Sequence, residues 1–276
     1  MSLQLFDTHC HPHEMVRRTT PVYDKWRSDG VERDPDEVIQ AAREVGVEYM
    51  ICVGTTAEDS EQAIDFVKGR ENLWASVGIH PHEASETLAH KRNVTHFASL
   101  VESEKVVAVG ECGLDYFYDH SSREDQLAML HFQIELALAA ELPLIFHVRD
   151  AFADFWPIFE EYQIASGGKL RGVLHSFTDN IANLERAISH GLYVGVNGIA
   201  TFAKTPENNV IYRTIPQHLL LLETDAPFLT PTPFRGKVCE SKHLRVTAEY
   251  LAGLRDVSLE ELAEHTTANA HALFGI

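Results

Sequence analysis

The chain has 276 residues, of which 45% are hydrophobic, so it can bury a core large enough for one α/β domain over residues 1–276. Its formal net charge of −18 excludes strong non-specific electrostatic binding to long duplex DNA, because such binders rely on basic side chains that neutralise phosphates. A nuclease with a metal-centred pocket stays compatible with this charge, since divalent cations supply positive charge locally. Four cysteines are too few for a disulfide scaffold in a chain this long, and we expect the cysteines to be small residues packed in the core.

The first residues, Met1–Asp7, lack a basic region followed by a long apolar region, so we expect no signal peptide. No apolar run approaches the roughly 20 residues that are needed to span a bilayer. We therefore expect a soluble, cytoplasmic protein with no membrane association.

Short apolar runs alternate with stretches of helical periodicity along the chain, with glycine and proline between them. This alternation predicts repeated strand–helix units, and roughly eight such runs suit a closed (β/α)8 TIM barrel. We expect strands near residues 3–7, 47–54, 73–79, 106–110, 142–147, 171–175, 191–196 and 219–223.

The segments between these runs carry apolar residues at spacings of three and four and predict the outer helices. Two more amphipathic helices are expected over His243–Phe274, with a break at Asp256–Ser258 and a capping box formed by Ser258 and Glu261. A polar segment from Glu14 to Pro35 is long for a strand-to-helix connection, and we expect a lid or a partner contact there. The other helices are expected over residues 36–45, 60–68, 125–141, 154–162 and 180–189.

Histidines and carboxylates recur where these apolar runs end. In a barrel of parallel strands such ends share one face, so residues far apart in sequence converge on one pocket. His9 and His11 are two residues apart in an extended run, so both rings project to the same side and can hold one ion. Such a pair is by itself equally well explained as two polar residues at the end of a strand. The ligand-type residues at the ends of the other strands favour a metal site.

Glu111 stands among glycines at the end of an apolar run, which favours a role in which its two oxygens bridge two cations. His147 and His175 end successive runs and suggest a second ligand pair, although either alone is compatible with a core histidine. Asp225 is the better candidate for metal ligand and proton acceptor in the last strand, with Glu223 orienting a ligand.

His80 and His82 also follow a strand and flank a proline. We interpret them as contacts to the substrate phosphate or the leaving group rather than as further ligands, because better-placed ligand candidates are already available. Arg149, Arg235 and Lys237 are the cations nearest to strand ends and are candidates to clamp phosphate oxygens. Each of these three is also compatible with an ordinary surface charge.

Taken together, these segments resemble the TatD family of metal-dependent deoxyribonucleases, within the wider amidohydrolase-like barrels. The likeness runs in order along most of the chain, and a set of motifs this long is highly specific. The resembling segments are Asp7–His11, Gly78–His82, Gly110–Asp115, His147–Ala151, Leu174–Phe177 and Glu223–Pro227, with Asn269 and Leu273–Phe274 near the end.

The resemblance implies a (β/α)8 barrel with a divalent-metal centre and magnesium-supported DNA hydrolysis, often exonucleolytic. Some relatives have been proposed as D-aminoacyl-tRNA deacylases. The chain departs from the family pattern at Arg235–Ser241, which lacks the usual asparagine and proline, and in the longer segment after His11. In the centre that the resemblance implies, His9 and His11 hold one ion, His147 and His175 hold the other, Glu111 bridges, and Asp225 ligates near the hydrolytic water.

We therefore predict a hydrolase with two divalent ions that cleaves phosphodiester bonds by a metal-activated water. Magnesium or manganese is the expected working metal, while zinc, iron or nickel also suits these donors in purified protein. The expected substrate is DNA ends or short single-stranded nucleic acid, with no obligate protein partner. The alternatives are an amide or ester hydrolase on the same centre, such as a D-aminoacyl-tRNA deacylase, and a non-catalytic binding protein, which the filled ligand positions disfavour.

Overall fold

The computed structural model describes residues 3–17, 20–202 and 205–276. Within these residues, eight strands form a sheet in the order β1 to β8, and every strand expected from the sequence is present. The strands are β1 (Leu5–Cys10), β2 (Val47–Val53), β3 (Leu73–Val77), β4 (Val106–Asp115), β5 (Leu144–Arg149), β6 (Gly172–Leu174), β7 (Tyr193–Val196) and β8 (Leu220–Leu222).

Helices separate the strands, as the alternating pattern predicts. Those that match an expected helix are α3 (Pro35–Glu44), α4 (Ala57–Val67), α7 (Arg123–Ala140), α8 (Phe152–Ala165), α9 (Ile181–Ser189), α11 (Leu244–Arg255) and α12 (Leu259–Phe274). Those not expected are α1 (Glu14–Arg17), α2 (Pro21–Trp26), α5 (Ala84–Ala89), α6 (Lys91–Leu100) and α10 (Pro206–Thr214), with short 3-10 turns η1 (Pro81–Glu83), η2 (Gly198–Thr201), η3 (Gln217–Leu219) and η4 (Ser241–His243).

Three strands extend further than their apolar runs. β1 continues to Cys10, which pairs with Cys52, while β4 continues to Asp115 and β5 to Arg149, which pair with each other. The expected strand ends near residues 7, 110 and 147 were therefore wrong, because backbone pairing continues where the side chains turn polar. As a result His9 and Glu111 lie inside strands, where the backbone fixes the direction of each side chain.

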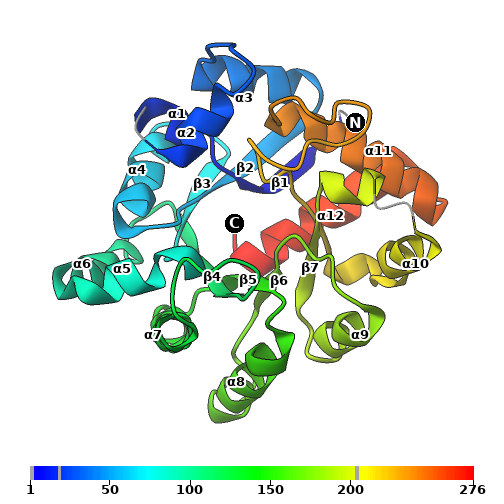
Figure 1. Cartoon of the computed structure of the whole chain (residues 1–276). Coiled ribbons are helices and arrows are strands. Elements are labelled where there is room, and N and C mark those ends of the chain that lie inside the picture. The colour runs from blue at the N-terminus through cyan, green and yellow to red at the C-terminus, as the bar shows by residue number, and fades with distance from the viewer. Residues whose placement is uncertain (1–2, 18–19, 203–204) are drawn as a thin grey trace. The chain divides into compact units, whose positions relative to one another are not determined.

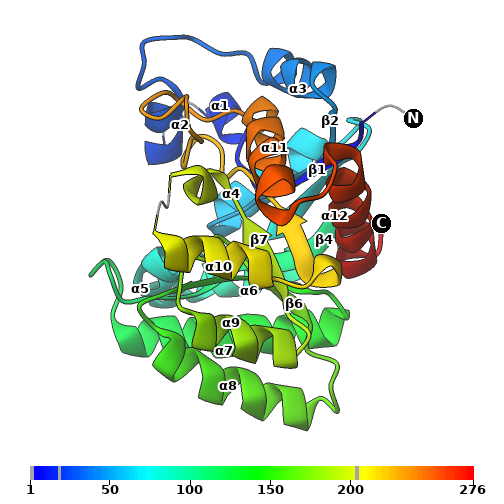
Figure 2. The same cartoon turned by 90° about the vertical axis from the view of Figure 1, so that its right-hand side faces the viewer.

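The chain forms two compact units. Unit 1 comprises residues 1–52 and 176–272, and unit 2 comprises residues 53–175 and 273–276. In unit 1, β1 pairs with β2, β7 pairs with β8, and a parallel bridge joins Cys10 to Ala226, while α10 contacts α11 (Figure 2). The single domain expected over residues 1–276 stays a prediction.

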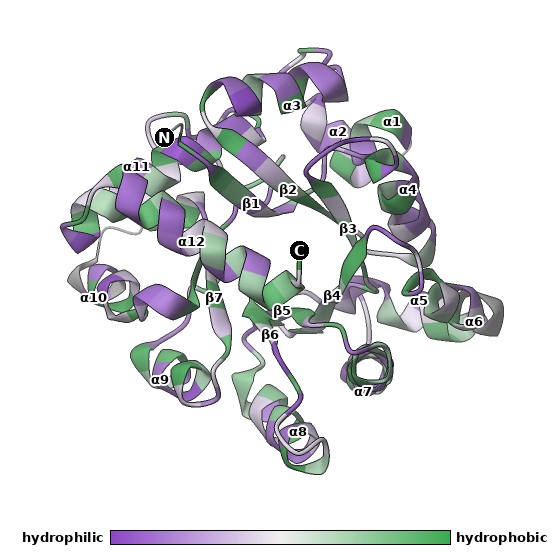
Figure 3. Cartoon of the chain, turned by 180° about the vertical axis from the view of Figure 1, so that it is seen from behind, coloured by the Kyte–Doolittle hydropathy of each residue, from purple (hydrophilic) through white to green (hydrophobic). Residues whose placement is uncertain are grey.

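In unit 2, β3, β4, β5 and β6 are consecutive in the sheet. Helices α7 and α8 lie on the outer side of β4 and β5 (Figure 1), and α7 packs directly on β4. Figure 3 shows β3 to β5 mainly in the colours of hydrophobic residues, which agrees with the complete burial of Val77, Val109 and Phe146. The core of this unit therefore lies between its strands and the inner faces of its helices.

All four cysteines are free and buried, in agreement with a packing role. No helix among the described residues combines the length and the hydrophobicity that crossing a membrane requires.

The long segment after β1 is anchored within unit 1; its residues 18–19 lie outside those described. Trp26 is 1% exposed, and its indole N–H donates to the carbonyl of His11 at 3.1 Å. Arg33 pairs with Asp29 at 2.6 Å and with Glu240 at 3.0 Å. The two segments that depart from the resembling family pattern are therefore joined to each other by the Arg33–Glu240 ion pair.

His243 lies beside this ion pair, at the end of η4. The backbone N–H of Glu240 donates to His243 Nδ1 at 2.9 Å, so this nitrogen must be unprotonated to accept. Burial lowers the pKa of His243 to about 4, with Lys242 and Arg33 acting in the same direction and the negative charge of Glu240 opposing. His243 is therefore neutral in the folded protein at neutral pH.

This environment predicts a pH-dependent stability. Between pH 6.5 and 4 the unfolded chain protonates His243 and the folded chain does not, so the free energy of unfolding falls as the pH falls. We expect His243→Gln, whose oxygen can still accept the Glu240 N–H, to reduce this loss by about 3 kcal/mol between pH 7 and pH 4. Urea denaturation of both proteins across this range is the measurement, and parallel pH profiles would contradict it.

Candidate metal centre

Unit 1 contains the first cluster of metal-type ligands, formed by His9, His11 and Asp225. Each residue offers one ligand atom, and these atoms all lie within 4.8 Å of one another. Asp225 Oδ1 lies 3.4 Å from His11 Nε2 and 3.7 Å from His9 Nε2. His9 is fully buried and His11 is 3% exposed. Two imidazole nitrogens and a carboxylate oxygen in this arrangement fit a divalent transition metal.

The position of Asp225 is fixed by hydrogen bonds between β1 and the turn that follows β8. The backbone N–H of Asp225 donates to the carbonyl of His9 at 2.8 Å. One residue earlier, Thr224 donates its N–H and its hydroxyl to the two carboxylate oxygens of Asp7, at 2.9 and 2.7 Å. Burial raises the pKa of Asp7 to about 7, although the hydrogen bonds from Thr224 act against this rise. Asp7 thus positions Asp225 indirectly, through Thr224.

Unit 2 contains the second cluster, formed by His80, Glu111 and His147, whose ligand atoms also lie within 4.8 Å of one another. Glu111 Oε1 is 2.6 Å from His147 Nδ1, 3.6 Å from His80 Nε2 and 3.7 Å from His175 Nε2. A single carboxylate oxygen therefore lies near three imidazoles. His80, interpreted from the sequence as a substrate contact, lies as near to Glu111 as His175 does.

Asp115 is a buried residue of this cluster that sequence reasoning did not select. Its Oδ2 lies 2.9 Å from His147 Nε2 and 3.1 Å from His82 Nε2. Asp115 lies four residues after Glu111 on the same strand, so the alternation of side chains places both on one side of β4. That spacing was a signal present in the sequence. His82 thus reaches the cluster through Asp115.

His147 lies between two carboxylates. Burial alone would lower its pKa, but the hydrogen bonds with Asp115 and Glu111 raise it to about 9. Burial likewise acts to raise the pKa of Asp115, and the hydrogen bonds from His147 and His82 outweigh it and hold that pKa far below the usual range. A metal ion at either nitrogen of His147 must displace a proton and one carboxylate contact, so metal affinity should fall with acidity.

Two glycines allow the strands of unit 2 to approach closely at this cluster. A Cβ atom at Gly113, where φ is +148°, would overlap the carbonyl oxygen of His147. A Cβ atom at Gly78 would overlap the backbone of Gly110 and Glu111. The glycines around the ligands therefore permit the spacing that brings Glu111 to the imidazoles.

The candidate phosphate-binding cations occupy exposed positions against aromatic rings. Arg149 lies over Phe117 at 3.9 Å in unit 2, and Arg235 lies over Phe202 at 3.7 Å in unit 1. Glu223, the candidate orienting residue, accepts a hydrogen bond from the backbone N–H of Ser176 at 2.6 Å.

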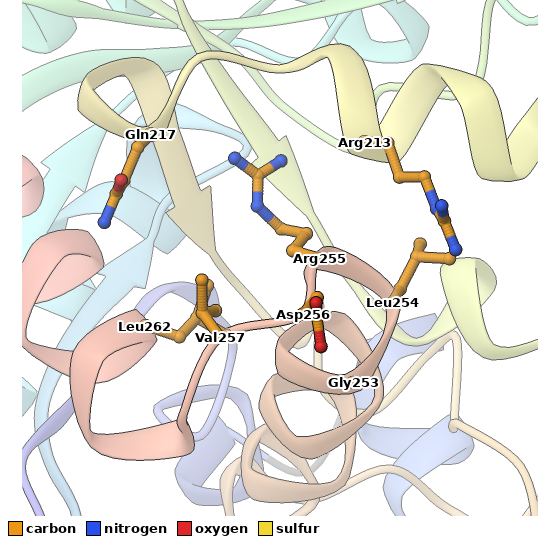
Figure 4. A pocket seen from close by; sticks show the side chains of 8 residues that line it. All are labelled: Arg213, Gln217, Gly253, Leu254, Arg255, Asp256, Val257 and Leu262. Carbon is orange, nitrogen blue, oxygen red and sulfur yellow. The ribbon is translucent and has the colours of Figure 1, made fainter.

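A pocket of about 570 Å³ lies elsewhere in unit 1, beside the turn between α11 and α12 (Figure 4). Arg213 and Arg255 line it together with Asp256, and none of the predicted site residues does. Arg255 donates to the carbonyls of Tyr212 and Ile215, at 2.6 and 2.8 Å, so its guanidinium holds the end of α10. We therefore interpret this pocket as a structural hollow.

Comparisons with known proteins identify the family of the chain. A sequence profile of the family described as TatD related DNase matches residues 6–275. An uncharacterized metal-dependent hydrolase of Bacillus subtilis, YabD, is 34% identical over 272 residues, which cover 99% of each chain. The 3'-5' ssDNA/RNA exonuclease TatD of Erwinia amylovora is 36% identical over 253 residues, which cover 88% of this chain and 95% of the relative.

A solved structure has the same fold over the whole length. The crystal structure of YJJV, a TatD homolog from Escherichia coli K12, matches with a TM-score of 0.84 and 26% identity, covering 100% of both chains. With eight strands in chain order and helices between them, the (β/α)8 TIM barrel expected from the sequence is confirmed.

Proposed function

Because this chain belongs to the TatD-related DNase family, we propose that it is a metal-dependent hydrolase that cleaves phosphodiester bonds at DNA ends or in short single-stranded nucleic acid. The observation that carries the proposal is the pair of clusters: the ligand atoms of His9, His11 and Asp225 lie within 4.8 Å of one another, and Glu111 Oε1 lies 2.6 Å from His147 Nδ1 and 3.7 Å from His175 Nε2. Hydrolytic metal sites use such donors because imidazole and carboxylate together leave positions open for water and substrate.

In this proposal, His9, His11 and Asp225 would hold one divalent ion, and Glu111 with His147 and His175 would hold a second. Bound ions lower the pKa of water and neutralise charge on the phosphate. The carboxylate of Asp225, 17% exposed, accepts the proton of the attacking water. Bridging of the two ions by Glu111 stays a prediction. The donors suit zinc, manganese, iron and nickel, and magnesium or manganese remains our proposal for the working metal.

The substrate contacts are proposed for four residues outside the main ligand set. His80 and His82 lie at the second cluster, where imidazole N–H groups can donate to phosphate or leaving-group oxygens. Arg149 and Arg235 each lie over an aromatic ring, a position from which their N–H groups can still donate to phosphate oxygens. We also propose a cytoplasmic location without an obligate protein partner.

A single-stranded end is the substrate class that we favour, and the name of the Erwinia exonuclease supports it. An amide or ester hydrolase, such as a D-aminoacyl-tRNA deacylase, is the alternative that the comparisons do not favour. The two are separated by reloading metal-free protein with one metal at a time and assaying single-stranded DNA, aminoacyl-tRNA and simple esters. Turnover of aminoacyl-tRNA alone would replace the nuclease assignment.

We expect short single strands to be hydrolysed about as efficiently, per scissile end, as long DNA, with a shallow dependence on monovalent salt. The net charge is −18, so affinity must come from the metal ions and a few contacts near the scissile bond. The measurement compares kcat/KM on short and long oligonucleotides across a salt series. A strong preference for long duplex together with a steep salt slope would reveal an extended basic track and contradict the prediction.

A further inference from the structure

Two adjacent aromatic rings are exposed just after β4 in unit 2. Phe117 is 55% exposed and Tyr118 is 44% exposed, and their ring centroids lie 4.7 Å apart. The guanidinium of Arg149, at the end of β5, lies 3.9 Å from the Phe117 ring centroid and 5.1 Å from that of Tyr118. We call Phe117, Tyr118 and Arg149 the aromatic platform. Single exposed apolar residues are normal on a surface, but two contiguous rings held by a cation form a defined surface.

The aromatic platform is attached directly to the second cluster. Asp115 Oδ1 accepts hydrogen bonds from the backbone N–H groups of Phe117 and Tyr118, at 3.0 and 3.2 Å. The other oxygen of the same carboxylate contacts His147 and His82. The Tyr118 ring also lies 5.4 Å from the His82 ring, centroid to centroid. One buried carboxylate therefore fixes both the imidazoles of the cluster and the backbone of the platform.

This placement suits a nucleobase better than other surface ligands. A base presents a flat π-face to an aromatic ring whatever its sequence, whereas a base inside a duplex has both faces already stacked. The guanidinium of Arg149 lies over the Phe117 ring, and an arginine in this position can still offer N–H donors to a neighbouring phosphate. With a net charge of −18, the chain has little electrostatic attraction for an extended backbone, so stacking gains importance.

We infer that Phe117 and Tyr118, held by Arg149 and Asp115, form a stacking subsite for a nucleobase of a single-stranded substrate beside the scissile phosphate. This inference rests on the proposed function and adds a specificity determinant to it. Because every base has a π-face, the subsite selects unstacked ends and tolerates sequence. Loss of one stacked base or one platform ring should lower kcat/KM by about 10-fold to 100-fold.

The test uses metal-loaded full-length protein and two single-stranded oligonucleotides, one natural and one with abasic nucleotides flanking the scissile bond. We expect the wild type to prefer the natural strand by about 10-fold to 100-fold. Phe117→Ala and Tyr118→Ala should lose this preference and yet cleave the abasic strand as the wild type does. Tyr118→Phe should retain it, because the ring remains. Ile164→Ala, which removes an 81% exposed apolar side chain in α8, is the matched control and should change neither rate.

The outcomes separate this inference from the proposed function. Equal cleavage of both strands by the wild type and by both alanine variants would overturn the stacking subsite and leave the nuclease assignment standing. Equal losses on both strands in the alanine variants would also overturn it, since the rings would then act only by positioning Asp115 and His147. A wild type that cleaves neither strand would overturn the proposed function, and the subsite with it.

Discussion

Asp225→Asn should lower turnover by about 10²-fold or more while preserving the fold. Asparagine keeps the shape of the side chain, and the backbone N–H of residue 225 still donates to the carbonyl of His9. The substitution removes the negative charge beside His9 and His11 and removes the group that accepts the proton of the attacking water. Steady-state rates at saturating metal are the measurement, with metal content determined on the same samples.

Glu249→Gln is the control for this experiment. It also neutralises one carboxylate in unit 1, but Glu249 is an exposed residue of α11 that pairs with Arg245. Its turnover should equal that of the wild type, because an exposed pair on one helix contributes little. Turnover near the wild-type value in Asp225→Asn would show that another group serves as the base.

The strands were predictable because their burial is nearly continuous. Even β6 and β8, which are three residues long, stand out as apolar runs, because a strand covered on both faces leaves no room for polar alternation. Helix α6 was not expected although Val94, Phe97 and Leu100 recur at spacings of three, and Phe97 and Leu100 are buried. Helix α2 had a local signal that was not used, since Thr20 caps it and Pro21 begins it.

The candidate ligands could be selected from the sequence because side-chain alternation is a local property. His9 and His11 differ by two positions on one extended run, and the sequence alone places them on one side. The partners of each carboxylate depend instead on distances between strands. Only the structure shows that Glu111 lies as close to His80 as to His175, and that Asp115 holds His147. The exposure of Phe117 also depends on how separate segments pack, and the sequence alone does not show it.

Glu111→Gln should have the largest effect of any single substitution, with a loss of about 10³-fold or more in turnover and the loss of both ions. We expect the wild type to bind two ions per chain. A carboxylate that bridges them contributes to the affinity for each, and an amide cannot replace its charge. Elemental analysis after removal of free metal gives the count, and anomalous scattering from metal-soaked crystals locates each ion.

Two ligand variants make the metal count decisive. His11→Ala removes a donor of the first cluster, and His175→Ala removes a donor near Glu111, so each variant should lose one ion and keep the other. If Glu111 bridges the two ions, Glu111→Gln should contain less metal than either of these variants. Should Glu111→Gln instead retain one ion, as His175→Ala does, Glu111 would serve the second cluster alone. A single ion in the wild type at full metal occupancy would contradict the two-ion centre itself.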